Sequence, residues 1–164
     1  MEITDNIKKD FKQKLLEEGM TRLTQCCGYL SEDEIWHKPN TNSNSVAVIL
    51  AHLEGNVRQY IISGLGGKAD ERQRDAEFEL IKGNVTSEEL LNKLHDTVRE
   101  AISIVERIEA DVLMETRDVQ CFSMTGLSII IHVIEHFSYH LGQVVYYTKY
   151  IKDMDTGFYK GLKL

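Results

Sequence analysis

The chain has 164 residues, of which 42% are hydrophobic and one is proline, so it can bury the core of one ordinary domain and is too apolar for a disordered chain. Its formal net charge of −7 argues against nucleic-acid binding, which depends on clustered lysine and arginine. No apolar run approaches the roughly 20 residues that span a membrane, and the charged N-terminus lacks the apolar stretch of a signal peptide. Because three cysteines also make a poor disulfide framework, we expect a cytoplasmic protein of one domain, residues 1–164, without a membrane or nucleic-acid partner.

The first half of the chain predicts two long helices. Apolar residues recur at helical spacing over residues 3–29, where Gly19 interrupts the stripe and leaves room for close packing. A capping box at Ser31–Glu34 predicts a short helical turn. The second long helix is expected over residues 45–63, because a second apolar stripe ends there in a group of glycines.

The second half predicts two more helices. Residues 64–85 form the longest connection, and a loop of this length usually crosses a bundle or carries function. A capping box at Thr86 begins the third helix, which we expect to end near Ala110. A connection more extended than helical then leads to the last helix, over residues 126–151, with Thr125 as its cap.

Four amphipathic helices without a convincing strand predict an all-α fold, a four-helix bundle. The long connection between the second and third helices allows an up-down-down-up order, in which these two helices run in the same direction.

Histidines are the chemically informative residues. The last helix carries three of the six at four-residue spacing, namely His132, His136 and His140. Residues four apart share one face of a helix, and two such imidazoles can bind one metal ion. His52, in the middle of the second helix, is the natural third ligand. A site of three neutral histidines retains the metal's full charge, which lowers the pKa of bound water to about 7 and deprotonates a bound thiol.

Other interpretations of these histidines compete with this one. A single histidine at the margin of a core is usually a hydrogen-bonded structural residue, although three in a column favour a metal site. The segment His132–His136 also matches the short H-x-x-E-H pattern of inverted zinc proteases, in which Glu135 would be the base and His140 would be left unused. A di-iron site needs two Glu-x-x-His motifs, and the chain has one, Glu34–His37, so this class is excluded.

Three segments carry a resemblance to a known family. They are Asn44–Asn56 in the second helix, Arg74–Phe78 in the long connection and Glu135–Gln143 in the last helix. Through them, and over most of its length, the chain resembles the DinB-like (DinB/YfiT) metalloenzymes, particularly their DUF1572 branch. The resemblance implies an up-down-down-up four-helix bundle, a homodimer, and a divalent metal ion, zinc or nickel, held by His52, His136 and His140.

The resemblance leaves several neighbouring residues with open roles. The candidates for hydrogen bonds that orient the ligands, or for positions that line a pocket, are Asn56, His132, Tyr139 and Gln143. The sequence does not decide whether Asp75 or Glu77 reaches the site, where a carboxylate could act as a base or as a further ligand.

The wider superfamily includes transferases and isomerases that use bacillithiol, mycothiol or glutathione. The resemblance therefore implies an enzyme in which the metal activates a low-molecular-weight thiol for attack on a small electrophile. The same site could instead activate water for hydrolysis. The alternatives are a non-catalytic bundle that binds a metal or small ligand and a plain bundle whose histidines never meet. A pocket beside an open metal position would favour an enzyme, whereas a closed four-coordinate site would favour a structural role.

Overall fold

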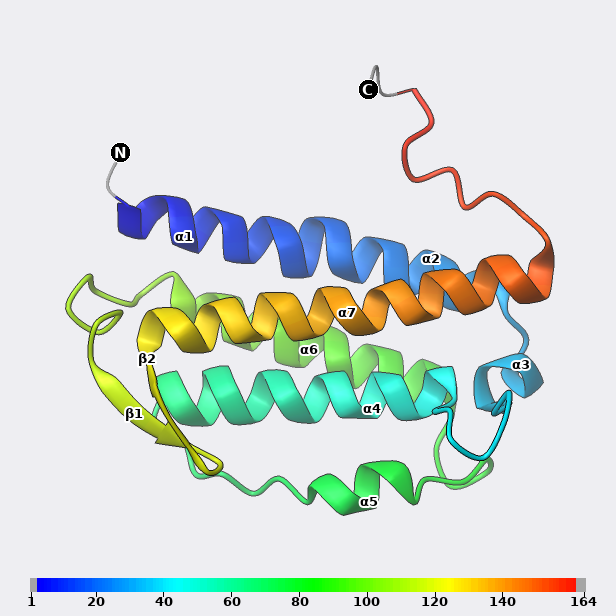
Figure 1. Ribbon diagram of the computed structural model, residues 1–164, viewed down its shortest axis with the longest axis horizontal. Coiled ribbons are helices and arrows are strands. Elements are labelled where there is room, and N and C mark those ends of the chain that lie inside the picture. Colours follow the sequence, from blue (N-terminus) through cyan, green and yellow to red (C-terminus); the bar gives the residue numbers. More distant parts are fainter. Residues whose placement is uncertain (1–2, 162–164) are drawn as a thin grey trace.

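The structure is a computed structural model that describes residues 3–161, and most of this part is helical (Figure 1). The helical elements, in which η marks a π-helical stretch, are α1 (Ile3–Lys12), η1 (Gln13–Met20), α2 (Thr21–Tyr29), α3 (Glu32–Trp36), α4 (Val46–Val57), η2 (Arg58–Leu65), α5 (Arg74–Phe78), α6 (Ser87–Val105) and α7 (Gly126–Lys152). Because η1 joins α1 to α2 and η2 prolongs α4, these elements make four long helical runs and two short helices. None of the helices in this range combines the length and the apolar character that a membrane span needs.

The predicted helix starts are confirmed at three caps. The hydroxyls of Ser31 and Thr86 each accept a hydrogen bond from the backbone N–H three residues later, and both capping boxes are reciprocal. Thr125 accepts from the backbone of Ser128 in the same way. The third helix ends at Val105, earlier than predicted, because the chain tightens there into i→i−3 turns such as Ile108 N–H to the Val105 carbonyl.

The expectation that the chain has no strand was wrong. An antiparallel hairpin, β1 (Thr116–Val119) and β2 (Phe122–Thr125), precedes α7, with Val119 opposite Phe122. The turn between the strands lacks the Asn-Gly or Gly-Gly pair that usually signals a hairpin. Gln120 instead adopts a φ of +58° there. Because the sequence lacks that turn signal, it predicted an extended connection before the last helix and did not predict that the connection pairs into a hairpin.

The core lies between the helical runs. α7 packs against η1 and α2 on one side and against α4 and η2 on the other, while α6 covers α4, η2 and α1. The segment between η2 and α6 crosses over along α4 and carries α5, as Figure 1 shows. α4 is buried almost all round, so the polar residues on it lie inside the protein.

Gly19 provides the close packing that the sequence predicted for the first helical run, and the structure shows that the partner is α7. A Cβ atom at this position would lie 2.8 Å from Cε1 of Phe137, whose side chain is buried. The backbone oxygen of Lys14 would lie closer still, at 2.7 Å, so a larger residue at position 19 requires both the aromatic ring and the helix backbone to shift.

We expect Gly19→Ala to lower the free energy of unfolding by about 1–3 kcal/mol, because a methyl group would overpack the contact with Phe137. The matched control is Gly28→Ala in α2, where a Cβ atom would meet no atom within 4 Å. That change should leave stability unchanged or raise it by about 0.5–1 kcal/mol. Urea unfolding of both variants measures the difference, and equal stability would show that the contact adapts at no cost.

Candidate metal centre

Two helices bring three histidines together. His52 lies in the middle of the buried α4, whose start is fixed by the Ser45 cap. His136 and His140 lie one turn apart on α7, which packs against α4. A ligand nitrogen of each ring lies within 4.8 Å of the corresponding nitrogens of the other two, so this group could hold a metal ion.

The spacing within the group fits a shared ion. Nε2 of His52 lies 3.1 Å from Nε2 of His136. Two imidazole nitrogens bound at the 2.0–2.1 Å usual for zinc, with a tetrahedral angle between them, would be about 3.3 Å apart. The ring of His140 lies 5.0 Å from that of His52 and 4.6 Å from that of His136, measured between centroids. The three rings therefore lie close enough together for one ligand nitrogen of each to reach a shared ion.

Hydrogen bonds assign the free nitrogen of two of the rings. Nδ1–H of His140 donates to Oε1 of Gln143 at 2.8 Å. Nδ1–H of His52 donates to Oε2 of Glu77 at 2.9 Å, which is shorter than the 3.3 Å from the same nitrogen to a guanidinium nitrogen of Arg72. Because an imidazole with its proton on Nδ1 has its lone pair on Nε2, both rings present Nε2 to the group.

Burial favours the neutral form of the two histidines on α7. Burial, followed by repulsion from His140 and His52, lowers the pKa of His136 to about 3. Burial also lowers the pKa of His140, although its hydrogen bond to Gln143 acts in the opposite direction. Since metal ions bind the neutral form of histidine, His136 and His140 need not lose a proton to bind one near neutral pH. Nδ1 of His136 is buried and, among the described residues, has no hydrogen-bond partner.

Glu77 is the carboxylate that the sequence could not place. It lies in α5, on the segment that crosses over along α4, and its Oε1 and Oε2 accept hydrogen bonds of 2.7 and 3.0 Å from Arg72. Burial opposes ionisation of Glu77, but the bonds from His52 and Arg72 outweigh it and lower its pKa. Asp75, the other candidate, is 96% exposed and lies 4.0 Å from Arg74, away from the histidines.

His132 and Asn56 form a separate contact beside the group. The His132 ring stacks on Tyr60 at a centroid distance of 4.2 Å, and the Asn56 side-chain amide lies 3.4 Å from its Nε2. Burial lowers the pKa of His132, and Glu135 acts in the opposite direction. His132 thus lies outside the group of three. The H-x-x-E-H pattern would need His132 and His136 as the ligands, whereas the structure groups His136 with His140 and His52.

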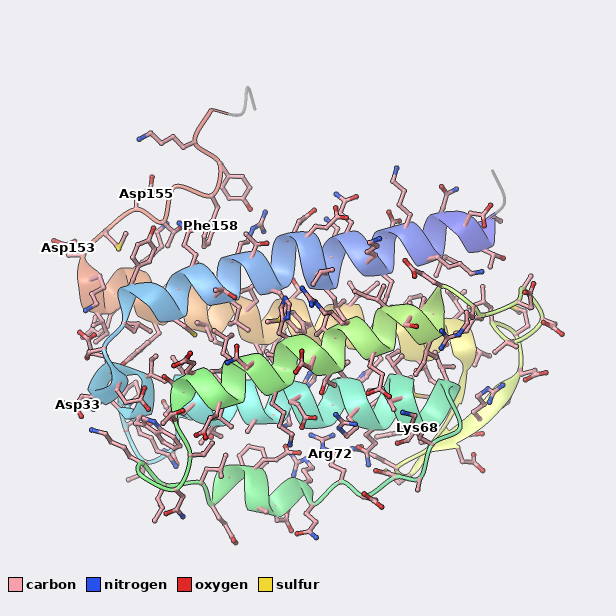
Figure 2. The ribbon with its side chains drawn as sticks, turned by 180° about the vertical axis from the view of Figure 1, so that it is seen from behind. Asp33, Lys68, Arg72, Asp153, Asp155 and Phe158 are labelled. Atoms are coloured by element: carbon pink, nitrogen blue, oxygen red, sulfur yellow. The ribbon has the colours of Figure 1, made fainter. Side chains whose placement is uncertain are left out.

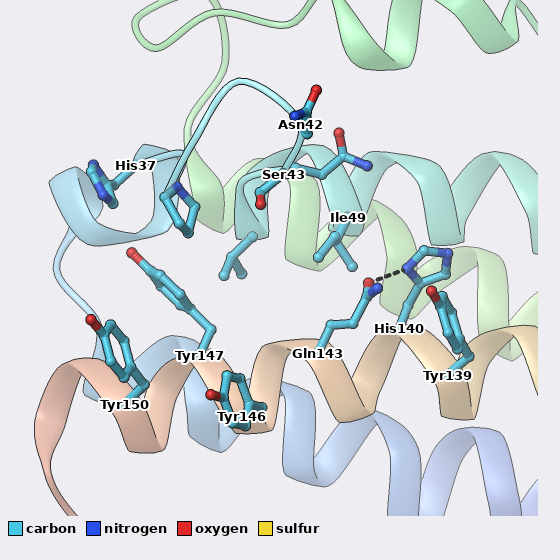
Figure 3. A pocket seen from close by; sticks show the side chains of 13 residues that line it. His37, Asn42, Ser43, Ile49, Tyr139, His140, Gln143, Tyr146, Tyr147 and Tyr150 are labelled. Atoms are coloured by element: carbon cyan, nitrogen blue, oxygen red, sulfur yellow. Dashed lines mark hydrogen bonds between the residues drawn. The ribbon is translucent and has the colours of Figure 1, made fainter.

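A cavity of about 620 Å³ adjoins His140 and Gln143 (Figure 3). It lies between α7 and the loop before α4, and Tyr139 is at its edge, with its ring 5.0 Å from that of His140. The lining residues are His37, Pro39, Asn42, Ser43, Asn44, Val46, Ile49, Tyr139, His140, Gln143, Tyr146, Tyr147 and Tyr150. None of them is a lysine, arginine, aspartate or glutamate. The row of tyrosines follows helical spacing and could have been read from the sequence, whereas the facing loop could not.

The fold and the site together define a helical protein with a three-histidine group that could hold a metal ion. The sequence model of the family described as "Protein of unknown function (DUF1572)" matches residues 5–159. The chain therefore belongs to the DUF1572 family, and the resemblance drawn from its motifs is confirmed.

Solved structures share this fold. A DinB-like protein of Bacillus subtilis, YjoA, is 16% identical, with a TM-score of 0.66 over 92% of this chain and 94% of its own. A conserved protein from Enterococcus faecalis is 15% identical, with a TM-score of 0.64 over 94% of this chain and 99% of its own. At these identities the likeness concerns the fold alone. Among curated proteins, none matches the chain.

The metal content of single variants tests which histidines bind. We expect wild-type protein that has been incubated with zinc or nickel and desalted to retain about one ion per chain. His52→Ala should lose it, because two ligands remain, whereas His132→Ala should keep it. Plasma mass spectrometry measures the ratio, and His95→Ala on α6 controls for the loss of any histidine. Loss in His132→Ala with retention in His52→Ala would instead favour the H-x-x-E-H interpretation.

Proposed function

We propose that this protein is a metal-dependent enzyme in which His52, His136 and His140 hold a divalent ion, zinc or nickel, and a low-molecular-weight thiol attacks a small electrophile. The observation that carries the proposal is a group of three histidines, each with a ligand nitrogen within 4.8 Å of the others, next to a cavity. We further infer that the four long helical runs form an up-down-down-up bundle, which supports the site by holding α4 against α7.

The donor set supports this chemistry. Three neutral ligands leave an ion with its full charge, and such an ion, when bound, lowers the pKa of a thiol or water in its open position. Gln143 holds His140 by its Nδ1–H, and burial lowers the pKa of His136 to about 3, so this ring is neutral near neutral pH. Three protein ligands beside a cavity are typical of catalytic sites, whereas a structural zinc site has four.

Transfer of a thiol is favoured over hydrolysis because, among the described residues, the candidate bases at the group are already engaged: Glu77 by Arg72 and His52, and Nε2 of His132 by the Asn56 amide. Attack by water is commonly assisted by a carboxylate or histidine that takes up the proton. Glu77 is the carboxylate that touches the three-histidine group in the described chain, and it accepts hydrogen bonds from both Arg72 and His52. A thiol, which ionises more readily than water, needs no such base.

The cavity supports an uncharged electrophile. Tyr146 and Tyr150 are 73% and 71% exposed, so their rings are available at its mouth for stacking. Asn42, Ser43 and Gln143 add amide and hydroxyl groups that could donate or accept hydrogen bonds. Since the lining contains no lysine, arginine, aspartate or glutamate, a charged electrophile could not form an ion pair with one of these side chains there.

The direct test is a rate measurement on the metal-loaded protein. With glutathione or cysteine and a neutral aryl chloride, we expect product formation well above the rates with free metal or metal-free protein. His140→Ala should fall to the background. Cobalt-loaded protein should also show a thiolate-to-metal charge-transfer band when the thiol is added. Metal binding without that band or any thiol transfer, together with metal-dependent hydrolysis of a neutral ester, would make the protein a hydrolase instead.

A second prediction separates the cavity from the metal site. Tyr146→Ala should raise KM for the aryl electrophile several-fold and leave the metal content unchanged, because the ring lines the cavity without touching the three-histidine group. Tyr159→Ala is the matched control, since Tyr159 is 56% exposed and lies outside that cavity. Steady-state kinetics on both variants gives the comparison, and equal KM values would place the electrophile elsewhere.

A further inference from the structure

The crossover segment 70–78 brings a buried ion pair, Arg72 and Glu77, to Nδ1 of His52, the ring nitrogen that faces away from the other two histidines. The Arg72 side chain is 3% exposed and Glu77 is 10% exposed, although both lie on a connection whose other charged residues are solvated. Figure 2 shows Arg72 between the crossover and α4. Its guanidinium donates to both carboxylate oxygens of Glu77, and one of these oxygens accepts from Nδ1–H of His52.

α4 is shaped to receive this pair. Gly55 lies three residues after His52 on the same helix. A Cβ atom on Gly55 would collide with Oε1 of Glu77 and would lie 2.8 Å from Nε of Arg72. The glycine therefore forms a slot in which the ion pair rests directly against the helix backbone.

Little else attaches this segment to the rest of the protein. No residue of α5 is fully buried, and its largest apolar side chain, Phe78, is half-buried with its ring 5.3 Å from that of His52. Arg72 makes a further bond of 2.9 Å to the side chain of Gln59, which in turn donates to Asp70 at 2.7 Å. The contacts that hold the segment in place thus centre on Arg72 and on the edge of the histidine group.

We propose that Glu77, clamped by Arg72 in the slot at Gly55, is a positioning residue that turns Nε2 of His52 toward His136 and His140, so that metal binding and docking of segment 70–78 are coupled. The inference rests on the proposed metal site. A carboxylate on the far nitrogen of a ligand fixes the ring and its tautomer. Because coupling between two events is reciprocal, a metal ion that favours this orientation of His52 must also favour the docked segment.

The first test compares three variants of the segment. Glu77→Ala should weaken binding of zinc about 10- to 100-fold, measured by competition with a chromophoric chelator. Glu77→Gln should recover part of the loss, because its amide oxygen can still accept from Nδ1–H. Glu79→Ala, which removes an exposed carboxylate from the same segment, is the control and should match the wild type.

A readout without metal isolates the positioning role. Long-range ¹H–¹⁵N NMR of the metal-free protein should show His52 with its proton on Nδ1 in the wild type and in Glu79→Ala. In Glu77→Ala that signal should shift toward the other tautomer. A general loss of structure would alter the signals of all the histidines, whereas the proposed role predicts that His52 changes most.

The second test displaces the ion pair from the helix side. In Gly55→Ala the methyl group should push the two flexible side chains out of the slot and weaken zinc binding by a similar factor, while Gly28→Ala should not. Hydrogen exchange should show amides of residues 70–78 slowed by zinc in the wild type and insensitive to zinc in Gly55→Ala.

The outcomes distinguish the inference from the proposed function. If the wild type binds zinc and Glu77→Ala binds it equally well with an unchanged His52 tautomer, the positioning role is wrong and the metal site stands. If zinc binds and leaves the exchange of residues 70–78 unchanged, the coupling is wrong. If the wild type binds neither zinc nor nickel, the proposed function fails and the coupling fails with it.

Discussion

The site depends on the packing of α4 against α7. His52 is separated from His136 by 84 residues, yet their Nε2 atoms lie 3.1 Å apart, and that distance is set by where the two helices touch. Gly19 contributes from the opposite side of α7, because its lack of a side chain lets Phe137 sit close to the first helical run. A shift of α7 by a fraction of a turn would separate the histidines, so the core packing and the ligand geometry are one constraint.

The electrostatics of the site follow from this burial. The cost of burying a charged imidazole keeps His136 neutral, with its pKa lowered to about 3, and Glu77, the carboxylate found at the group within residues 3–161, is neutralised by Arg72. The protein charges that reach the three histidines therefore nearly cancel. An ion placed among them would keep most of its own charge, which is what activation of a thiol or a water molecule requires. A further unpaired carboxylate at the group would have reduced that charge.

The sequence predicted the parts of this arrangement that depend on local rules. Periodicity placed His136 and His140 on one face of one helix, and the caps at Ser31, Thr86 and Thr125 fixed where helices begin. That His52 faces them came from its position on a buried helix, together with the family resemblance. Arg72 was missed, and the choice between Asp75 and Glu77 stayed open, because no period governs a connection. Which of its charged residues turns inward depends on a slot in another helix, at Gly55.

Two connections without long helices, the crossover between η2 and α6 and the hairpin before α7, both contact the π-helical stretch η2. A π turn widens the helix and interrupts the regular i→i−4 ladder, and such turns are frequent at functional sites. Here Gln59 and Tyr60, neighbours in sequence, are both buried, and both bind Gln120 at the tip of the hairpin. Gln59 also binds Arg72 of the crossover. The hairpin and the crossover are therefore joined through one side chain, one turn beyond the ion pair that supports His52. Movement of the crossover would reach His52 through Arg72, whereas the hairpin also leads directly into α7, because Thr125 ends β2 and caps that helix.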